Sequence, residues 1–195
     1  MYKASLVLRV IAVASLLGCA QQGPSKAVAE IGEAASQHDV SRFERLVDVA
    51  GVSEKWGKDM VAALWARGID LSALERVGVS REYQERSLAE QGAVIIRECV
   101  GDGKCGDGGN PWSLAGVFGA LAGRDGRVES ISTESTEGKL ATVAIKIKPS
   151  NAEAQFIEAK MRERDGQWQL VELLNQMKLE AAWSAARKAA NSGTK

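Results

Sequence analysis

A glycine-rich stretch at residues 99–111 gathers several residue types that take part in chemistry. Gly101, Gly103 and Gly106 are spaced as G-x-G-x-x-G, a pattern that in dinucleotide sites lets a pyrophosphate approach the N-terminus of a helix. The residues at 107–111 are Asp-Gly-Gly-Asn-Pro, a sequence that does not open such a helix. We therefore expect a flexible loop here, and no nucleotide or other cofactor.

The same loop carries oxygen ligands of the kind that calcium prefers. Asp102, Asp107 and Asn110 supply them, whereas Ca²⁺ takes six to eight oxygens. Their spacing matches no EF-hand, and no glutamate stands where a bidentate ligand is needed. A calcium site at these three residues is an alternative to a solvated cluster of turn residues, which we favour.

His38 is the only histidine in the sequence, and it falls near the end of an expected helix. Catalysis of the Ser-His-Asp type would need it beside a serine and an aspartate, and the sequence contains no local signature of such a site. A closed zinc site needs more ligands than one histidine and two cysteines. We expect His38 to cap or pack a helix end, and we expect the protein not to be an enzyme.

The first 18 residues are organised like a secretion signal. Lys3 and Arg9 form a positive region, and an uncharged apolar run follows at 10–17. The run has the length of a signal peptide's apolar segment and is too short to cross a bilayer. The tetrapeptide at 16–19, Leu-Leu-Gly-Cys, resembles the bacterial lipobox.

This resemblance implies that the chain is cleaved before Cys19 and that Cys19 carries acyl chains such as palmitate. Ala20 stands where aspartate would signal retention in the inner membrane, so the rules of the family imply transport to the outer membrane. Residues 19–25 would then form a tether that reaches about 20 Å and holds the domain near the bilayer, facing the periplasm. The alternatives are an uncleaved apolar helix and an ordinary signal cut elsewhere.

If lipidation uses Cys19, two of the three cysteines remain. An even number of cysteines in an oxidising compartment favours a disulfide. Cys99 and Cys105 flank glycines that let the chain turn back, so we expect these two cysteines to pair. Two free thiols are the alternative.

The length and charge after the signal suit one domain without a nucleic-acid partner. Over the whole chain, 25 lysines and arginines balance 25 aspartates and glutamates. Because Lys3 and Arg9 lie in the signal, 23 positive side chains face 25 negative ones after it, and the net charge is −2. No basic stretch suits nucleic acid. We expect a single domain at 26–190, followed by a disordered tail at 191–195.

Helical periodicity in the first part of the chain gives way to strand alternation. A capping box at Ser41 and Glu44 predicts a helix that Gly51 ends. The segment from Arg81 to Arg86 looks like a solvated helix face. The expected helices cover about 25–38, 41–50, 56–67, 81–91, 112–122 and 176–190. The expected strands cover about 127–133, 141–148, 154–164 and 167–174.

The strands predict an antiparallel meander. Val143 and Ile145 alternate with polar residues, as in a half-buried strand, and Asp165-Gly166 is typical of a two-residue hairpin turn. Beyond that turn, Trp168, Leu170 and Leu174 are expected on one face. Helices followed by a meander indicate an α+β fold, with the N-terminal helices packed on a short curved sheet and a C-terminal helix after it.

Three stretches, 34–48, 110–123 and 156–175, together resemble a bacterial envelope family of unknown function. The last stretch also resembles the final hairpin of the cone-shaped nuclear-transport-factor-2-like and cystatin-like folds. These resemblances imply a fold and no catalytic residues. Trp112, Phe118 and Leu121 of the second stretch are candidates for a binding groove, although packing of their helix on the sheet is the interpretation we favour.

The sequence thus predicts a non-enzymatic outer-membrane lipoprotein. It would attach to the membrane through its N-terminal lipid and bind a periplasmic protein or an envelope component. One variant of this class is an inhibitor or immunity lipoprotein that neutralises an envelope-targeting toxin. The alternative is a carrier or sensor of a small hydrophobic ligand, held in the apolar cavity that cone-shaped folds commonly enclose.

Overall fold

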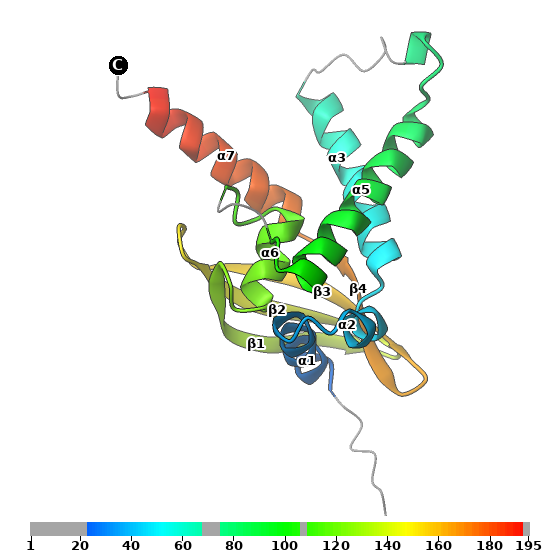
Figure 1. Ribbon diagram of the computed structural model, residues 1–195, viewed down its shortest axis with the longest axis vertical. Helices are drawn as coiled ribbons and strands as arrows, with labels where there is room; N and C mark the ends of the chain where they lie inside the picture. The colour runs from blue at the N-terminus through cyan, green and yellow to red at the C-terminus, as the bar shows by residue number, and fades with distance from the viewer. Residues whose placement is uncertain (1–22, 68–74, 106–108, 193–195) are drawn as a thin grey trace, which may run out of the picture.

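The computed structural model describes residues 23–67, 75–105 and 109–192, so the predicted sites at Cys19 and Asp107 lie outside the described residues. Helices and one four-stranded antiparallel sheet make an α+β fold (Figure 1). This architecture confirms the expected fold class with its C-terminal helix. Within the described ranges, no helix is both long and apolar enough to cross a membrane.

The sheet is a meander whose strands pair in chain order. The strands are β1 (Gly126–Glu137), β2 (Leu140–Pro149), β3 (Gln155–Arg164) and β4 (Gln167–Leu173). The β3–β4 turn is the one predicted: Asp165 and Gly166 have φ angles of 53° and 79°, in the left-handed region that a two-residue hairpin turn requires. The alternation predicted for β2 is also confirmed, because Val143, Ile145 and Ile147 are fully buried.

A β-bulge corrects one expectation for β4. The pairing with β3 advances from Leu170 directly to Glu172, so one residue is left over and the inward alternation shifts by one position. Leu173 is therefore 7% exposed, whereas Leu174, which was expected on the inner face with Trp168 and Leu170, is 37% exposed.

The first three helices are divided differently from the prediction. They are α1 (Pro24–Ser36), α2 (Val40–Leu46) and α3 (Val49–Ala66). Asp39 caps α2, because its carboxylate accepts a hydrogen bond from the backbone N–H of Arg42 at 2.9 Å. The capping box predicted at Ser41 and Glu44 is therefore wrong, and Glu44 pairs instead with Arg97 at 2.7 Å.

A contact with the sheet separates α2 from α3. Val47 forms a parallel bridge with Leu170 of β4, and the N–H of Asp48 donates to the Leu170 carbonyl at 2.8 Å. The Asp48 carboxylate then caps α3 by accepting from the N–H of Gly51 at 2.9 Å. Gly51 lies in the first turn of α3, so the prediction that it ends a helix is wrong.

After α3, the described part of the chain contains three further helices. They are α5 (Arg81–Asp102), α6 (Leu114–Leu121) and α7 (Gln176–Ser192). Serine side chains cap two of them: Ser80 accepts from the N–H of Tyr83, and Ser113 accepts from the N–H of Gly116. α5 is continuous through the segment 93–100, which the sequence left open between helix and strand. It ends at Gly103, whose φ is 73°.

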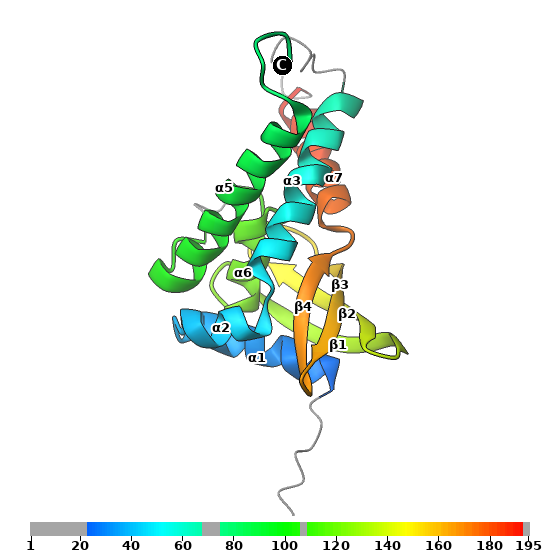
Figure 2. The ribbon, with the colours of Figure 1, turned by 90° about the vertical axis from the view of Figure 1, so that its right-hand side faces the viewer.

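The molecule has two parts (Figures 1 and 2). We call the sheet with α1, α2 and α6 the body. The pair α3 and α5, which we call the arm, rises from the body, and α7 extends from the same side of the body and diverges from the arm (Figure 1). In the body, the rings of Phe43 (α2) and Phe118 (α6) meet edge to face at 5.4 Å between centroids, and both side chains are fully buried.

Candidate functional site

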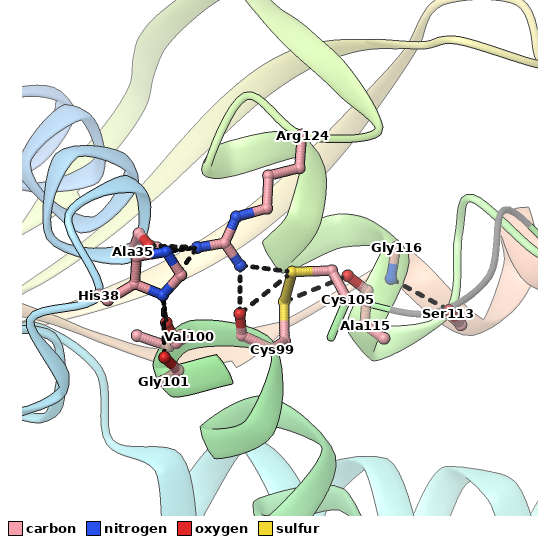
Figure 3. Close-up of a disulfide and its surroundings, with 10 residues drawn as sticks. All are labelled: Ala35, His38, Cys99, Val100, Gly101, Cys105, Ser113, Ala115, Gly116 and Arg124. Carbon is pink, nitrogen blue, oxygen red and sulfur yellow. Dashed lines mark hydrogen bonds between the residues drawn. A yellow bond between two sulfur atoms is a disulfide. The ribbon is translucent and has the colours of Figure 1, made fainter. Parts of the chain in front are cut away.

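Cys99 and Cys105 form a disulfide, as predicted. Cys99 lies in the last turn of α5 and Cys105 in the loop after it, and both are buried, at 0% and 3% exposure. The loop returns through Gly103, whose left-handed backbone conformation suits glycine. The disulfide therefore fixes the start of the glycine-rich loop against the end of α5 (Figure 3).

Arg124, which follows α6, joins the disulfide to the end of α1 (Figure 3). One guanidinium nitrogen donates to the Cys99 carbonyl and lies 3.1 Å from the Cys105 sulfur. The other donates to the Ala35 carbonyl at 3.0 Å. These carbonyls belong to the C-terminal turns of α5 and α1, where a positive charge complements the helix dipole. Arg124 is thus a structural link between two helix ends.

His38 completes this link. Its Nδ1 lies 3.0 Å from the Val100 carbonyl and 2.9 Å from the Gly101 carbonyl. Because carbonyls only accept, Nδ1 carries the hydrogen, and the side chain ties the end of α1 to the end of α5. Its backbone is left-handed, with φ 59°. The environment agrees with a residue that packs a helix end, as the sequence predicted.

The two residues of the calcium candidate that the structure describes, Asp102 and Asn110, have other partners. Asp102 lies 3.7 Å from the Lys104 amine. Asn110 accepts through its side-chain oxygen from the N–H of Trp112 at 3.0 Å, an interaction that shapes the turn before α6. Among the residues that the structure describes, no group of three or more histidine, cysteine, aspartate or glutamate side chains is placed to hold a metal ion.

The candidate groove residues belong to the hydrophobic core. Trp112 is 3% exposed, Phe118 is fully buried and Leu121 is 6% exposed, so α6 packs on the sheet as we favoured. Leu121 also lines an apolar pocket of about 320 Å³ between α1, α6 and β1, together with Val28 and Ile131.

A larger cleft, which sequence reasoning missed, lies between the two helices of the arm. Its volume is about 550 Å³. The lining residues recur at helical spacing on each wall. From α3 they are Ala50, Ser53, Glu54 and Lys58, and from α5 they are Glu82, Glu85, Arg86, Ala89, Glu90 and Ala93. The segment predicted as a solvated helix face therefore contributes one end of a cleft wall.

The cleft exists because α3 and α5 approach closely at small residues. A Cβ added at Gly57 would lie 2.6 Å from the Glu85 carbonyl oxygen and 2.9 Å from the backbone nitrogen of Ala89. A Cβ at Gly92 would lie 2.9 Å from the Trp56 ring. Glycines at the crossing let the backbones touch, and the larger side chains on one side of the crossing form the cleft walls. These glycines, at helical positions, were the sequence signal available.

Ion pairs order the walls of the cleft. Lys58 pairs with Glu54 at 2.5 Å, and the hydrogen bond that its ammonium donates to this carboxylate raises the pKa of Lys58. Glu85, which also lines the cleft, pairs at 2.8 Å with Arg81, which does not line it. On the floor, Ser53 is 1% exposed, and its hydroxyl finds no hydrogen-bond partner among the described residues.

A smaller pocket of about 240 Å³ lies between α3, α5, α6 and α7. It is lined by Trp56, Lys104 and Glu180, among others. The indole N–H of Trp56 is buried without a partner in the described part of the chain. Burial raises the pKa of Glu180, against a hydrogen bond from Gln176 (2.9 Å) that lowers it.

Comparison of the chain with known proteins assigns neither the arm cleft nor the disulfide link to a family. No protein-family model matches this chain, and neither the curated proteins nor the solved structures include a significant match to it.

Proposed function

We propose that this protein is a non-enzymatic binding module, anchored to the outer membrane through lipid on Cys19, that recognises a periplasmic protein or envelope component through the cleft between α3 and α5. The observation that carries the proposal is the cleft itself. Its volume of about 550 Å³ lies within the range of ligand pockets, roughly 300–1,000 Å³. An inhibitor of an envelope-targeting toxin is one variant of this role.

The make-up of the cleft supports recognition. Alanines at positions 50, 89 and 93 give an apolar floor, and charged side chains stand along both walls. An apolar floor favours burial of a ligand, while a few placed charges select its orientation. Because the paired walls already hold Glu54 and Glu85 in ion pairs, the charges are arranged before any ligand arrives.

The lipid anchor is supported by the lipobox resemblance at 16–19 and by the position of α1. This helix begins at Pro24, so few residues separate it from Cys19, and an extended segment of that length spans only about 14–20 Å. The start of α1 lies at the end of the molecule opposite the outer part of the arm (Figure 1). An anchored chain would therefore hold its body near the bilayer and extend the arm away from it.

Site-specific photocrosslinking in cells tests the binding role. A photoreactive residue replaces Arg86, which lines the cleft, or Gln91, which is exposed, does not line it and lies five residues further along the same helix. Five residues correspond to about 140° around a helix. We expect a discrete adduct from position 86 that position 91 does not give. The same adducts from both positions, or none from position 86, would exclude the cleft as the binding surface.

The apolar pocket beside β1 favours a second candidate, the carrier of a small hydrophobic ligand. Val28, Leu121, Val128 and Ile131 line this pocket of about 320 Å³, which lies at the β1 edge of the sheet. Native mass spectrometry of the purified chain tests it. A co-purifying mass that is lost with Ile131→Lys supports the carrier role, and a chain that carries no such mass rejects it.

A further inference from the structure

The arm cleft carries more negative charge than positive charge. Its lining has four glutamates and two cationic residues: Glu54, Glu82, Glu85, Glu90, Lys58 and Arg86. Two of the glutamates are already neutralised by ion pairs, one with Lys58 and one with Arg81. Glu82 and Glu90 form no ion pair among the described residues. The cleft therefore has two carboxylates available for a cationic ligand.

Arg86 lies one helical turn from each of these two carboxylates, yet its guanidinium lies over the Tyr83 ring, 5.7 Å from the ring centroid. Glu82 and Glu90 are eight residues apart, which places them about 12 Å apart along the axis of α5. A single metal ion cannot be coordinated by two carboxylates at this separation, because its ligands lie within about 2–3 Å of it. A ligand with two cationic groups joined by a stem fits the spacing.

Ser53 provides an independent sign of a ligand at the floor of the same cleft. It is 1% exposed, and its hydroxyl has no hydrogen-bond partner in the described part of the chain. Burial of a hydroxyl without a partner is unfavourable, and a ligand that donates a hydrogen bond would remove this cost. An ammonium or guanidinium group is such a donor. Ala89 and Ala93, which line the cleft beside it, suit the aliphatic stem that links such groups.

We propose that the cleft between α3 and α5 binds an organic polycation, with ammonium or guanidinium groups on aliphatic stems that contact Glu82, Glu90 and Ser53. The inference rests on the proposed binding role and names the ligand chemistry of the same site. A free polyamine and a lysine-containing segment of a partner protein share this chemistry. The positive charge of Arg86, which lines the cleft between the two carboxylates along α5, opposes the binding of a cation.

Calorimetric titration of the full chain in detergent at low ionic strength tests the proposal. Spermidine serves as the free polyamine and a blocked peptide with two lysines as the protein segment. We expect Glu82→Gln combined with Glu90→Gln to weaken binding about tenfold, because each partly exposed pair contributes up to about fivefold. Ser53→Ala should weaken it about two- to tenfold. Arg86→Gln should strengthen it about two- to threefold, opposite in sign to the glutamate changes on the same helix face.

Glu137→Gln, an exposed change at the end of β1, is the matched control and should leave the affinity unchanged. Butylamine, with one amino group, should bind much more weakly than spermidine. Preference for spermidine identifies a free polyamine as the source of the cation, and preference for the peptide identifies a protein segment. Failure of both probes to bind, or equal binding by the double glutamine variant, overturns the cation site. Cleft-specific crosslinks that persist in that case leave the binding role standing.

Discussion

The body and the arm are stabilised by different interactions. In the body, the inner faces of β2 and β3 and the helices α1, α2 and α6 bury large apolar side chains completely. In the arm, the buried residues of α5 are confined to its second half, from Gly92 onward. α3 buries only small and β-branched side chains such as Val52 and Val61, its backbone approaches α5 at Gly57, and the ion pairs at the cleft join residues within one helix. The comparison teaches that the apolar core fixes the body, while the arm keeps charged faces for recognition.

Loss of the central aromatic pair should show the largest difference between the two parts. Phe118→Ala leaves a cavity against Phe43 and should lower the free energy of unfolding by about 3–5 kcal/mol. Val94→Ala, at a residue of the arm that is 51% exposed, should change it by less than about 0.5 kcal/mol. Urea unfolding of both variants measures the difference. Similar losses would mean that the aromatic pair does not hold the body together more strongly than an exposed side chain of the arm.

Removal of the disulfide should have the next largest effect. Cys99→Ala with Cys105→Ala opens a short loop at the end of α5, and the chain-entropy relation gives a loss of about 2 kcal/mol. Thermal unfolding with and without a reducing agent measures it. The reductant should lower the melting temperature of the wild type and leave that of the double variant unchanged. A reductant-insensitive wild type would contradict the structural role of the disulfide.

A methyl group at the helix crossing should affect the arm selectively. Gly57→Ala places a Cβ against the Glu85 carbonyl, so α3 and α5 must separate, at a net cost of about 1–2 kcal/mol. It should also reduce crosslinking from position 86. Gly101→Ala, also in α5, is the control. Its Cβ would lie 3.4 Å from the Val40 side chain, an ordinary contact distance. Because alanine is a better helix former than glycine, this change should be neutral or slightly stabilising. Equal effects of the two changes would argue against the tight crossing.

The smallest expected effect concerns pH at the base of the arm. Burial raises the pKa of Glu180, so the folded chain holds this proton more tightly than the unfolded chain. The associated stability is present below the ordinary carboxyl pKa and is lost as the pH rises through the raised value. Glu180→Gln should therefore stabilise the chain at neutral pH, by under about 1 kcal/mol for a partly exposed group.

Thermal unfolding across the acid range measures this difference, which should vanish below the ordinary carboxyl pKa. If the difference in melting temperature between Glu180→Gln and the wild type stays constant with pH, the stabilisation comes from packing and not from removal of the charge.

Local patterns predicted the sheet because a two-residue period and a glycine turn act over short distances. The same reasoning failed at the α2–α3 boundary. The capping box expected at Ser41 and Glu44 does not form, because Asp39 caps α2. The break at Val47 depends on a bridge to Leu170, which no local pattern contains. In β4, one bulge moved the inner face from Leu174 to Leu173 for a similar reason.

The candidate sites divide in the same way. The Cys99–Cys105 pair was predicted from cysteine number and spacing, since its members are six residues apart. The contact of Arg124 with Ala35 spans 89 positions, and the cleft depends on how α3 crosses α5. The residues that form this contact and the cleft are present in the sequence, but tertiary packing decides which of them come together. A glycine at a helical position that opposes a backbone, such as Gly57, is the feature to search for first.

The placement of α1 opposite the outer arm affects how a partner would meet the cleft. α3 has 18 residues and is about 27 Å long. With the proposed tether, the cleft would move in two dimensions within a thin layer parallel to the membrane. A partner confined to that layer meets the cleft at a raised effective concentration. A partner held further from the membrane would be beyond the reach of the cleft. Both the charge of a partner and its distance from the membrane would therefore decide whether it binds.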